Sequence, residues 1–229
     1  MSLKIRGWRN ITKWAIWSVL GILFLVFWIK VAVFERNYYA EKEGSERAEA
    51  SVVETNDSDL VEEKPSESEV REYIVAPDRP RYLSVDKLNI VNARILPMTV
   101  NIEGELDTPN NIFDVGWYEA SGKPGQGGTL IIDGHNGGPH VKGVFKDLPS
   151  LAEGDIIKIE RGDGAIFNYR VVENVAIDLN DSDSYMSTAS QSPEPGEESV
   201  TLISCTGDWS QQQKTYLARQ FTRALLIKE

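Results

Sequence analysis

Residues 156–179 read IIKIERGDGAIFNYRVVENVAIDL, and this stretch decides the fold class. Phe167, Tyr169 and Val171 are large and mainly apolar, and polar residues stand between them, which is the two-residue period of a strand with one buried face. Gly162-Asp163-Gly164 separates two apolar runs and predicts a hairpin turn. The stretch therefore predicts strands at Ile156–Arg161, Ile166–Val172 and Val175–Leu179.

A similar pattern extends over residues 80–229, where short apolar runs alternate with the turn-forming residues Gly, Pro, Asn and Asp. Further strands are predicted at Ala93–Val100, Val115–Tyr118, Thr129–Asp133, Val200–Cys205 and Arg219–Ile227, and only Gly143–Leu151 has a briefly helical pattern. Eight short strands in about 150 residues are typical of a closed barrel or a sandwich. The fold class expected for residues 80–229 is all-β.

The composition excludes several classes of protein and site. The 229 residues include one cysteine and two histidines, and the formal net charge is -11. One thiol rules out an internal disulfide framework and a cysteine-rich zinc site, and the acidity argues against a nucleic-acid partner. Acidic residues such as Asp114, Glu119 and Asp155 form no recognisable ligand set, so we expect no cofactor and no metal.

The first 34 residues predict a cytoplasmic tail and a transmembrane signal anchor. An uncharged apolar run begins at Trp14, is interrupted only by Lys30 and ends at Phe34, about 31 Å of helix. Basic residues precede residues 14–34 and an acidic stretch follows, so the positive-inside rule places the N-terminus in the cytoplasm and the rest outside. A cleaved signal peptide, or less readily a buried core helix, is the alternative.

Residues 35–79 predict an acidic, disordered linker. They are rich in Glu, Ser and Asp and hold few large apolar side chains. Such a segment cannot bury enough surface to offset its chain entropy. We expect it to act as a tether, or equally as a solubilising tail, for the domain at 80–229.

Cys205 is the first candidate for chemistry. A lone cysteine outside the cytoplasm is a buried structural residue, an intermolecular bridge or a reactive group. Cys205 ends the apolar run VTLISC and precedes the polar segment TGDWSQQQ, so the sequence places its sulfur at the rim of the domain, where a nucleophile could act.

His135 and Arg219 are the candidate partners of that thiol. A cysteine nucleophile usually needs a proton-transfer partner, most often an imidazole. His135 directly follows an apolar strand, whereas His140 lies in a glycine-rich loop and has the character of an exposed residue. Arg219 begins the last strand and could return beside the thiol to stabilise an oxyanion, and Arg223 shares its strand face. Taken singly, each is better explained as a solvated surface residue; their occurrence together at strand ends of one domain favours a shared site.

The order of these residues resembles that of the sortases, the cysteine transpeptidases of bacterial cell surfaces. His135 lies in a GHN segment, Cys205 ends TLISC, and Arg219 stands near the C-terminus, all behind an N-terminal anchor. The resemblance covers about 150 residues. Within the family, the sequence is most similar to class F, with class D or E as alternatives. It also rests on ARILPM, DVGWY (114–118), KPGQGGTLIIDGHNGG (123–138), GVFKDLPSLAEGD (143–155) and RQFTRALL (219–226).

The resemblance implies an eight-stranded sortase-type β-barrel with short helices and a specific reaction. Cys205 would attack an LPxTG-like sorting signal, Arg219 would steady the oxyanion, and His135 would protonate the departing amine. An amine of a peptidoglycan precursor or a pilin would then release the thioester. Ser204 stands where the family usually has Thr, and the GGPFD-like sequence common in class F is absent after Cys205.

The same residues also allow a comparison with other classes of cysteine enzyme and with a non-catalytic protein. An L,D-transpeptidase calls for an SxGC-like neighbourhood, and an NlpC/P60-like peptidase places its cysteine before its histidine, so neither order matches. A tethered, non-catalytic β-barrel binding module, or an inactive sortase-like protein, is the remaining alternative. On this alternative, the presence of His135, Cys205 and Arg219 in the order found in sortases would be a coincidence.

Overall fold

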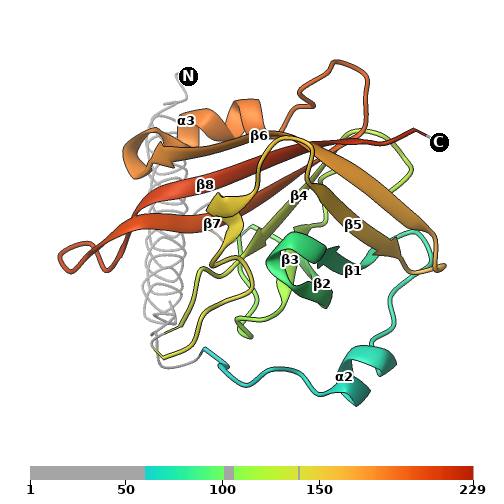
Figure 1. Cartoon of the computed structure of the whole chain (residues 1–229), viewed down its shortest axis with the longest axis horizontal. Coiled ribbons are helices and arrows are strands. Elements are labelled where there is room, and N and C mark those ends of the chain that lie inside the picture. Colours follow the sequence, from blue (N-terminus) through green and yellow to red (C-terminus); the bar gives the residue numbers. More distant parts are fainter. Residues whose placement is uncertain (1–59, 101–105, 139, 229) are drawn as a thin grey trace, which may run out of the picture. The chain divides into compact units, whose positions relative to one another are not determined.

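The computed structural model describes residues 60–100, 106–138 and 140–228 (Figure 1). Eight strands of this part of the chain form a closed barrel in the order β1-β2-β3-β4-β7-β8-β6-β5. They are β1 (Pro80–Val85), β2 (Ile90–Met98), β3 (Val115–Tyr118), β4 (Thr129–Gly134), β5 (Ile156–Arg161), β6 (Ile166–Asp178), β7 (Ser199–Ser210) and β8 (Thr215–Leu226). The all-β, eight-stranded barrel expected from the sequence is confirmed.

Strand pairing and side-chain alternation together build the core. Neighbouring strands pair antiparallel except β2 with β3 and β4 with β7, which run parallel. Trp117, Tyr169 and Phe145 are buried inside the barrel with branched aliphatic side chains from most of the strands. The burial of Tyr169 and Val171 on one face of β6 confirms the alternation that the sequence shows.

Apart from shifts of a few residues in the bounds of strands such as β2 and β8, the strands differ from the expectation in three places. The two strands expected within 166–179 are the single strand β6, in which the pairing register with β8 shifts between Val171 and Glu173. Strand β1, which begins at Pro80, was not expected. Strand β7 continues beyond Cys205, where the sequence suggested a turn, because Trp209 packs edge-on against Tyr216 across the β7–β8 hairpin at a centroid distance of 5.2 Å.

Helix α3 (Leu179–Ala189) is the longest helix within the described ranges and lies over the outer face of the barrel beside β8 and β6 (Figure 1). Tyr185 packs on Phe221 of β8 at a centroid distance of 4.9 Å, and the Thr201 hydroxyl group donates to the carbonyl oxygen of Ala189 (2.7 Å). The remaining helices are short: α2 (Glu67–Glu72) and the 3-10 turns η2 (Asp86–Leu88) and η3 (Leu148–Ser150). The helical pattern expected at Gly143–Leu151 is the turn η3.

Residues 60–79, which the sequence assigns to the linker, are ordered against the barrel. Ser66 and Glu69 form a capping box at the start of α2. The Tyr73 hydroxyl group donates to the carbonyl oxygen of Ile95 (2.6 Å), and the Tyr82 hydroxyl group donates to that of Val70. These bonds hold a segment whose composition alone predicts disorder.

The rest of the expected linker, residues 35–59, and the predicted anchor at 14–34 lie outside the described residues. Within the described ranges, no helix combines the length and the apolar character needed to cross a bilayer.

Candidate functional site

A cleft of about 1090 Å³ lies on the outer face of β4, β7 and β8. On β4, Leu130 and Ile132 belong to the barrel core, so the alternate residue Asp133 faces outward into the cleft. On β7, Leu202 belongs to the core and Cys205 lines the cleft. Helix α3 supplies another wall through Leu179, Ser182, Asp183 and Met186.

The parallel pairing of β4 with β7 sets His135 beside Cys205. Asp133 pairs with Ile203, so two residues further along the chain His135 follows the end of β4 and Cys205 stands in β7. The hydroxyl group of Ser204, which is buried within β7, donates to the carbonyl oxygen of Gly134 at the end of β4 (2.9 Å). The hydroxyl group beside the cysteine therefore fixes the backbone beside the histidine.

Arg219 reaches the cleft from the other side of Cys205. The two residues are cross-strand partners in the antiparallel β7–β8 ladder. The Arg219 guanidinium group donates to the carbonyl oxygens of Tyr216 (3.0 Å) and Ala218 (3.1 Å) and to the hydroxyl group of Thr215 (3.3 Å). A guanidinium group has five N–H donors, so these three bonds orient it and leave donors for a bound anion.

Burial and charge act on the Cys205 thiol in opposite directions. Burial raises the pKa of Cys205, and the nearby carboxyl group of Asp133 raises it further. The positive charge of Arg219 lowers it. The net effect is a Cys205 pKa above the ordinary value for cysteine. The thiol is therefore protonated at neutral pH, and a base must remove its proton before it can attack.

His135 is held by the connection between β2 and β3. Its ring nitrogen Nε2 lies 2.7 Å from the carbonyl oxygen of Pro109. A carbonyl oxygen only accepts, so Nε2 carries a proton when this bond is made, and Nδ1 bears the lone pair of the neutral ring. The Pro109 carbonyl group thus selects one tautomer of the imidazole.

The structure brings His135, Cys205 and Arg219 together, because all three line this cleft. Arg223 lies on the same face of β8 as Arg219, as their spacing of four residues predicts, but its side chain binds other groups of the protein. Its guanidinium group pairs with Glu173 (2.5 Å) and donates to carbonyl oxygens at the C-terminal end of α3, those of Thr188 and Gln191.

His140 is exposed and lies outside the cleft lining, which agrees with its expected character. Its backbone N–H donates to the carboxylate of Glu62 (2.8 Å).

Sequence reasoning missed the cleft residue Asp133 and its neighbour Thr108. Burial raises the pKa of Asp133 to about 7, and a hydrogen bond from the Thr108 side chain opposes this shift. Strand parity was the available signal, since Asp133 precedes His135 by two residues and therefore shares its face. Nothing in the sequence signals that Thr108 reaches it from another connection.

The acidic residues considered as metal ligands are occupied by cations of the protein itself. Asp114 pairs with Arg94 (2.7 Å), and Asp155 pairs with Lys87 (2.6 Å). Glu119 pairs with Arg79 (2.8 Å). In the part of the chain that the structure describes, no cluster of three or more His, Cys, Asp or Glu side chains could hold a metal ion.

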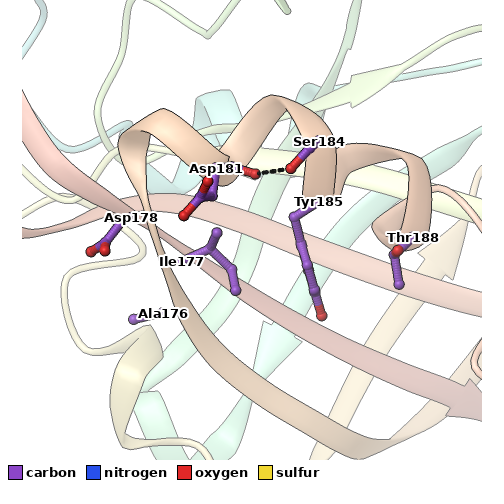
Figure 2. A pocket seen from close by; sticks show the side chains of 7 residues that line it. All are labelled: Ala176, Ile177, Asp178, Asp181, Ser184, Tyr185 and Thr188. Atoms are coloured by element: carbon purple, nitrogen blue, oxygen red, sulfur yellow. Dashed lines mark hydrogen bonds between the residues drawn. The ribbon is translucent and has the colours of Figure 1, made fainter.

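A second groove, of about 480 Å³, lies between β6 and α3 (Figure 2). Its lining is Ala176, Ile177, Asp178, Asp181, Ser184, Tyr185 and Thr188. It offers carboxylates and hydroxyl groups but neither a thiol nor an imidazole, so nucleophilic chemistry belongs to the first cleft.

Sortases are among the solved structures to which this chain is similar. Sortase C1 of GBS (group B Streptococcus) Pilus Island 1 is 20% identical over 69% of this chain and 68% of its own, with a TM-score of 0.49. A sortase D5 transpeptidase of Clostridium perfringens is 23% identical over 72% and 91%, with a TM-score of 0.46. Sortase A from Corynebacterium diphtheriae is 22% identical over 68% and 63%, with a TM-score of 0.48.

Among curated proteins no sequence match was found. The sortase domain family, however, matches residues 83–226, which is more than half of the chain and extends from the middle of β1 to the end of β8. The chain belongs to the sortase family, whose members are cysteine transpeptidases.

Proposed function

We propose that this protein is a membrane-anchored cysteine transpeptidase that cleaves an LPxTG-like sorting signal and transfers the cleaved protein to an amine. The observation that carries the proposal is the shared cleft, in which Cys205 is the cross-strand partner of Arg219 and stands beside His135 at the end of the parallel strand. A nucleophile, a cation for the oxyanion and a proton carrier are the parts that acyl transfer needs.

The first half-reaction forms a thioester. His135 accepts the proton of the Cys205 thiol, and the sulfur attacks the carbonyl carbon that precedes the glycine of the sorting signal. The guanidinium group of Arg219 stabilises the tetrahedral oxyanion. When the C–N bond breaks, the imidazolium returns its proton to the departing amine.

The second half-reaction regenerates the thiol. An amine of a peptidoglycan precursor or a pilin loses a proton to His135 as its nitrogen attacks the thioester carbon. The C–S bond breaks, and the thiolate of Cys205 recovers the proton from the imidazolium. The product is a new amide bond, and the enzyme ends in its starting state.

The predicted anchor at residues 14–34 suits this chemistry, because substrate and nucleophile would meet at the outer membrane face. We place the N-terminus in the cytoplasm of a bacterial cell and the barrel outside. Within the family, the DVGWY segment and the order of the later motifs favour class F, with class D or E as the alternatives.

A peptide-library cleavage assay on the full chain tests the proposal. Cys205→Ala should abolish cleavage, and His135→Ala and Arg219→Ala should each reduce the rate by at least a factor of about 100. His140→Gln is the matched control, since it removes the other imidazole at an exposed position outside the cleft, and it should cleave like the parent.

A chain that labels at Cys205 with a thiol reagent but turns over no sorting-signal peptide would instead be a tethered binding module or an inactive sortase-like protein.

A further inference from the structure

Asp133 is an ionisable group of the cleft that the reaction above does not use. It lies on the outer face of β4, two residues before His135, and it lines the same cleft as Cys205. Its partner on β3 is Gly116, and a Cβ atom there would come within 2.4 Å of the Asp133 carboxylate. The glycine thus leaves the space on the β3 side that this carboxylate fills.

A connected path runs from Asp133 to the imidazole. The Thr108 side chain hydrogen-bonds the Asp133 carboxylate. The next residue, Pro109, presents its carbonyl oxygen to Nε2 of His135 (2.7 Å). Consecutive residues of the β2–β3 connection therefore contact two side chains at the end of β4, and the carboxylate anchors the segment that selects the imidazole tautomer.

Asp133 also acts electrostatically on the thiol of Cys205. The carboxyl group of Asp133 and the guanidinium group of Arg219 both act on the charge state of Cys205, with opposite signs. Asp107, on the β2–β3 connection, adds a further negative charge near Asp133. The other ionisable side chains that line this cleft are His135, which directly follows β4, Asp183 on α3 and Tyr118 on β3.

We propose that Asp133 is a positioning residue of the cleft. Its charge opposes formation of the Cys205 thiolate, and its bond to Thr108 keeps the adjacent carbonyl group of Pro109 against the imidazole. The resting site then holds a protonated thiol beside an imidazole of defined tautomer, which is the pair that general-base activation needs. The inference rests on the proposed role of Cys205 as nucleophile.

The charge part is tested by alkylating the full chain with iodoacetamide between pH 6 and pH 10. Cys205 is the only cysteine of the sequence, so intact-mass spectrometry reports this thiol alone. Asp133→Asn keeps the shape and an acceptor for Thr108 but removes the charge. We expect alkylation about 3 to 10 times faster at pH 8 and a midpoint at lower pH. Superimposable profiles would overturn this part.

Asp181→Asn is the matched control for net charge, because Asp181 lies in the groove between β6 and α3 (Figure 2). It should alkylate like the parent. Equal acceleration by both variants would show a general charge effect and would overturn the proposal.

The positioning part is tested by the tautomer of His135. The chain has two histidines, so His140→Gln assigns the nitrogen signals in long-range ¹H–¹⁵N spectra. Thr108→Val removes the hydroxyl group and keeps the Asp133 charge. We expect it to convert the Nε2–H tautomer of His135 into a mixture, whereas Asp133→Asn retains it. An unchanged His135 spectrum in Thr108→Val would overturn this part.

These readouts separate the inference from the proposed function. Iodoacetamide and the imidazole spectrum need no sorting signal, so the inference can hold in a chain that cleaves no peptide. Conversely, if the protein cleaves peptide but the parent and Asp133→Asn have identical alkylation profiles, the transpeptidase function stands and the proposed effect of the Asp133 charge on Cys205 is wrong.

Discussion

Cys205 and Arg219 are cross-strand partners in the β7–β8 hairpin. The ladder register, rather than a loop, fixes their separation, and the charge of Arg219 lowers the pKa of a thiol that burial raises. Because the guanidinium group is also tied to the carbonyl oxygens of Tyr216 and Ala218, the cation is oriented before any substrate arrives. Such preorganisation is what oxyanion stabilisation requires.

Replacing Arg219 should therefore reduce turnover more than binding. We expect Arg219→Ala to lower kcat by a factor of about 100 to 1000, as for the loss of an oxyanion donor. Arg219→Lys should recover little, since an ammonium group cannot reproduce the planar fork that reaches two carbonyl oxygens and a ligand. Steady-state cleavage of a sorting-signal peptide measures both, and rates within a factor of about three of the parent would contradict this role.

The same residue should change the reactivity of the thiol with a small reagent. Arg219 lowers the pKa of Cys205, so Arg219→Ala raises it and leaves less thiolate at a given pH. We expect alkylation at pH 8 to slow by a factor of about 3 to 10, opposite in sign to Asp133→Asn. Faster alkylation of the Arg219 variant would mean that the guanidinium group does not face the sulfur.

Asp133 should also make the stability of the barrel depend on pH. Burial raises its pKa to about 7, so the folded state favours the protonated form. Its contribution to stability is complete below its ordinary pKa of about 4 and is lost as the pH rises through 7. Relative to the parent, Asp133→Asn should gain on the order of 2 to 4 kcal/mol of unfolding free energy between pH 4 and pH 8.

Urea unfolding at a series of pH values measures this difference. A constant offset between Asp133→Asn and the parent across the range would show that the carboxyl group titrates normally in the folded state.

Residues 61–63 form a strap that joins the two connections flanking His135. Val61 exchanges backbone hydrogen bonds with Asn110 and Ile112 of the β2–β3 connection. Glu62 accepts from the backbone N–H groups of His140 (2.8 Å) and Val141 (3.3 Å) after β4. A fragment that begins at residue 80 lacks this strap, so assays should use the longer chain.

The strap carboxylate should protect the loop that follows His135. Glu62→Ala removes an ionised acceptor of two backbone N–H groups, which is worth about 1 to 2 kcal/mol. We expect hydrogen exchange at His140 and Val141 to accelerate about tenfold. Glu63→Ala is the matched control, because Glu63 is exposed and, among the residues that the structure describes, its carbonyl oxygen is the only group that is used, as acceptor for the side chain of Asn111. Equal acceleration in both variants would contradict a specific role for Glu62.

The local pattern of apolar and turn residues was enough to predict the bounds of some strands. The bounds of β3 and β5 agree with the predicted ranges, and Gly164 takes the positive φ of 85° in the hairpin before β6 that the Gly-Asp-Gly turn anticipated. His135 and Cys205 were found because histidine and cysteine are rare in this chain and both follow apolar runs.

Tertiary packing decided what the pattern missed. Helix α3 has a polar sequence, LNDSDSYMSTA, and few of its residues pack on the barrel. Strand β7 continues past Cys205 because the Trp209 ring meets Tyr216 on the other strand. The role proposed for Asp133 depends on the register of β4 with β7 and on Thr108, which lies 25 residues earlier in the chain, and no local stretch of sequence contains both relationships.

The central claim is that Cys205 forms a thioester with a sorting-signal peptide. Its most direct test is intact-mass spectrometry of the full chain, quenched in acid after mixing with an LPxTG-like peptide. The account predicts an added mass equal to the peptide portion ahead of the glycine, located on Cys205, released by hydroxylamine and absent from Cys205→Ala. Full labelling by iodoacetamide without any peptide adduct or cleavage product would contradict it.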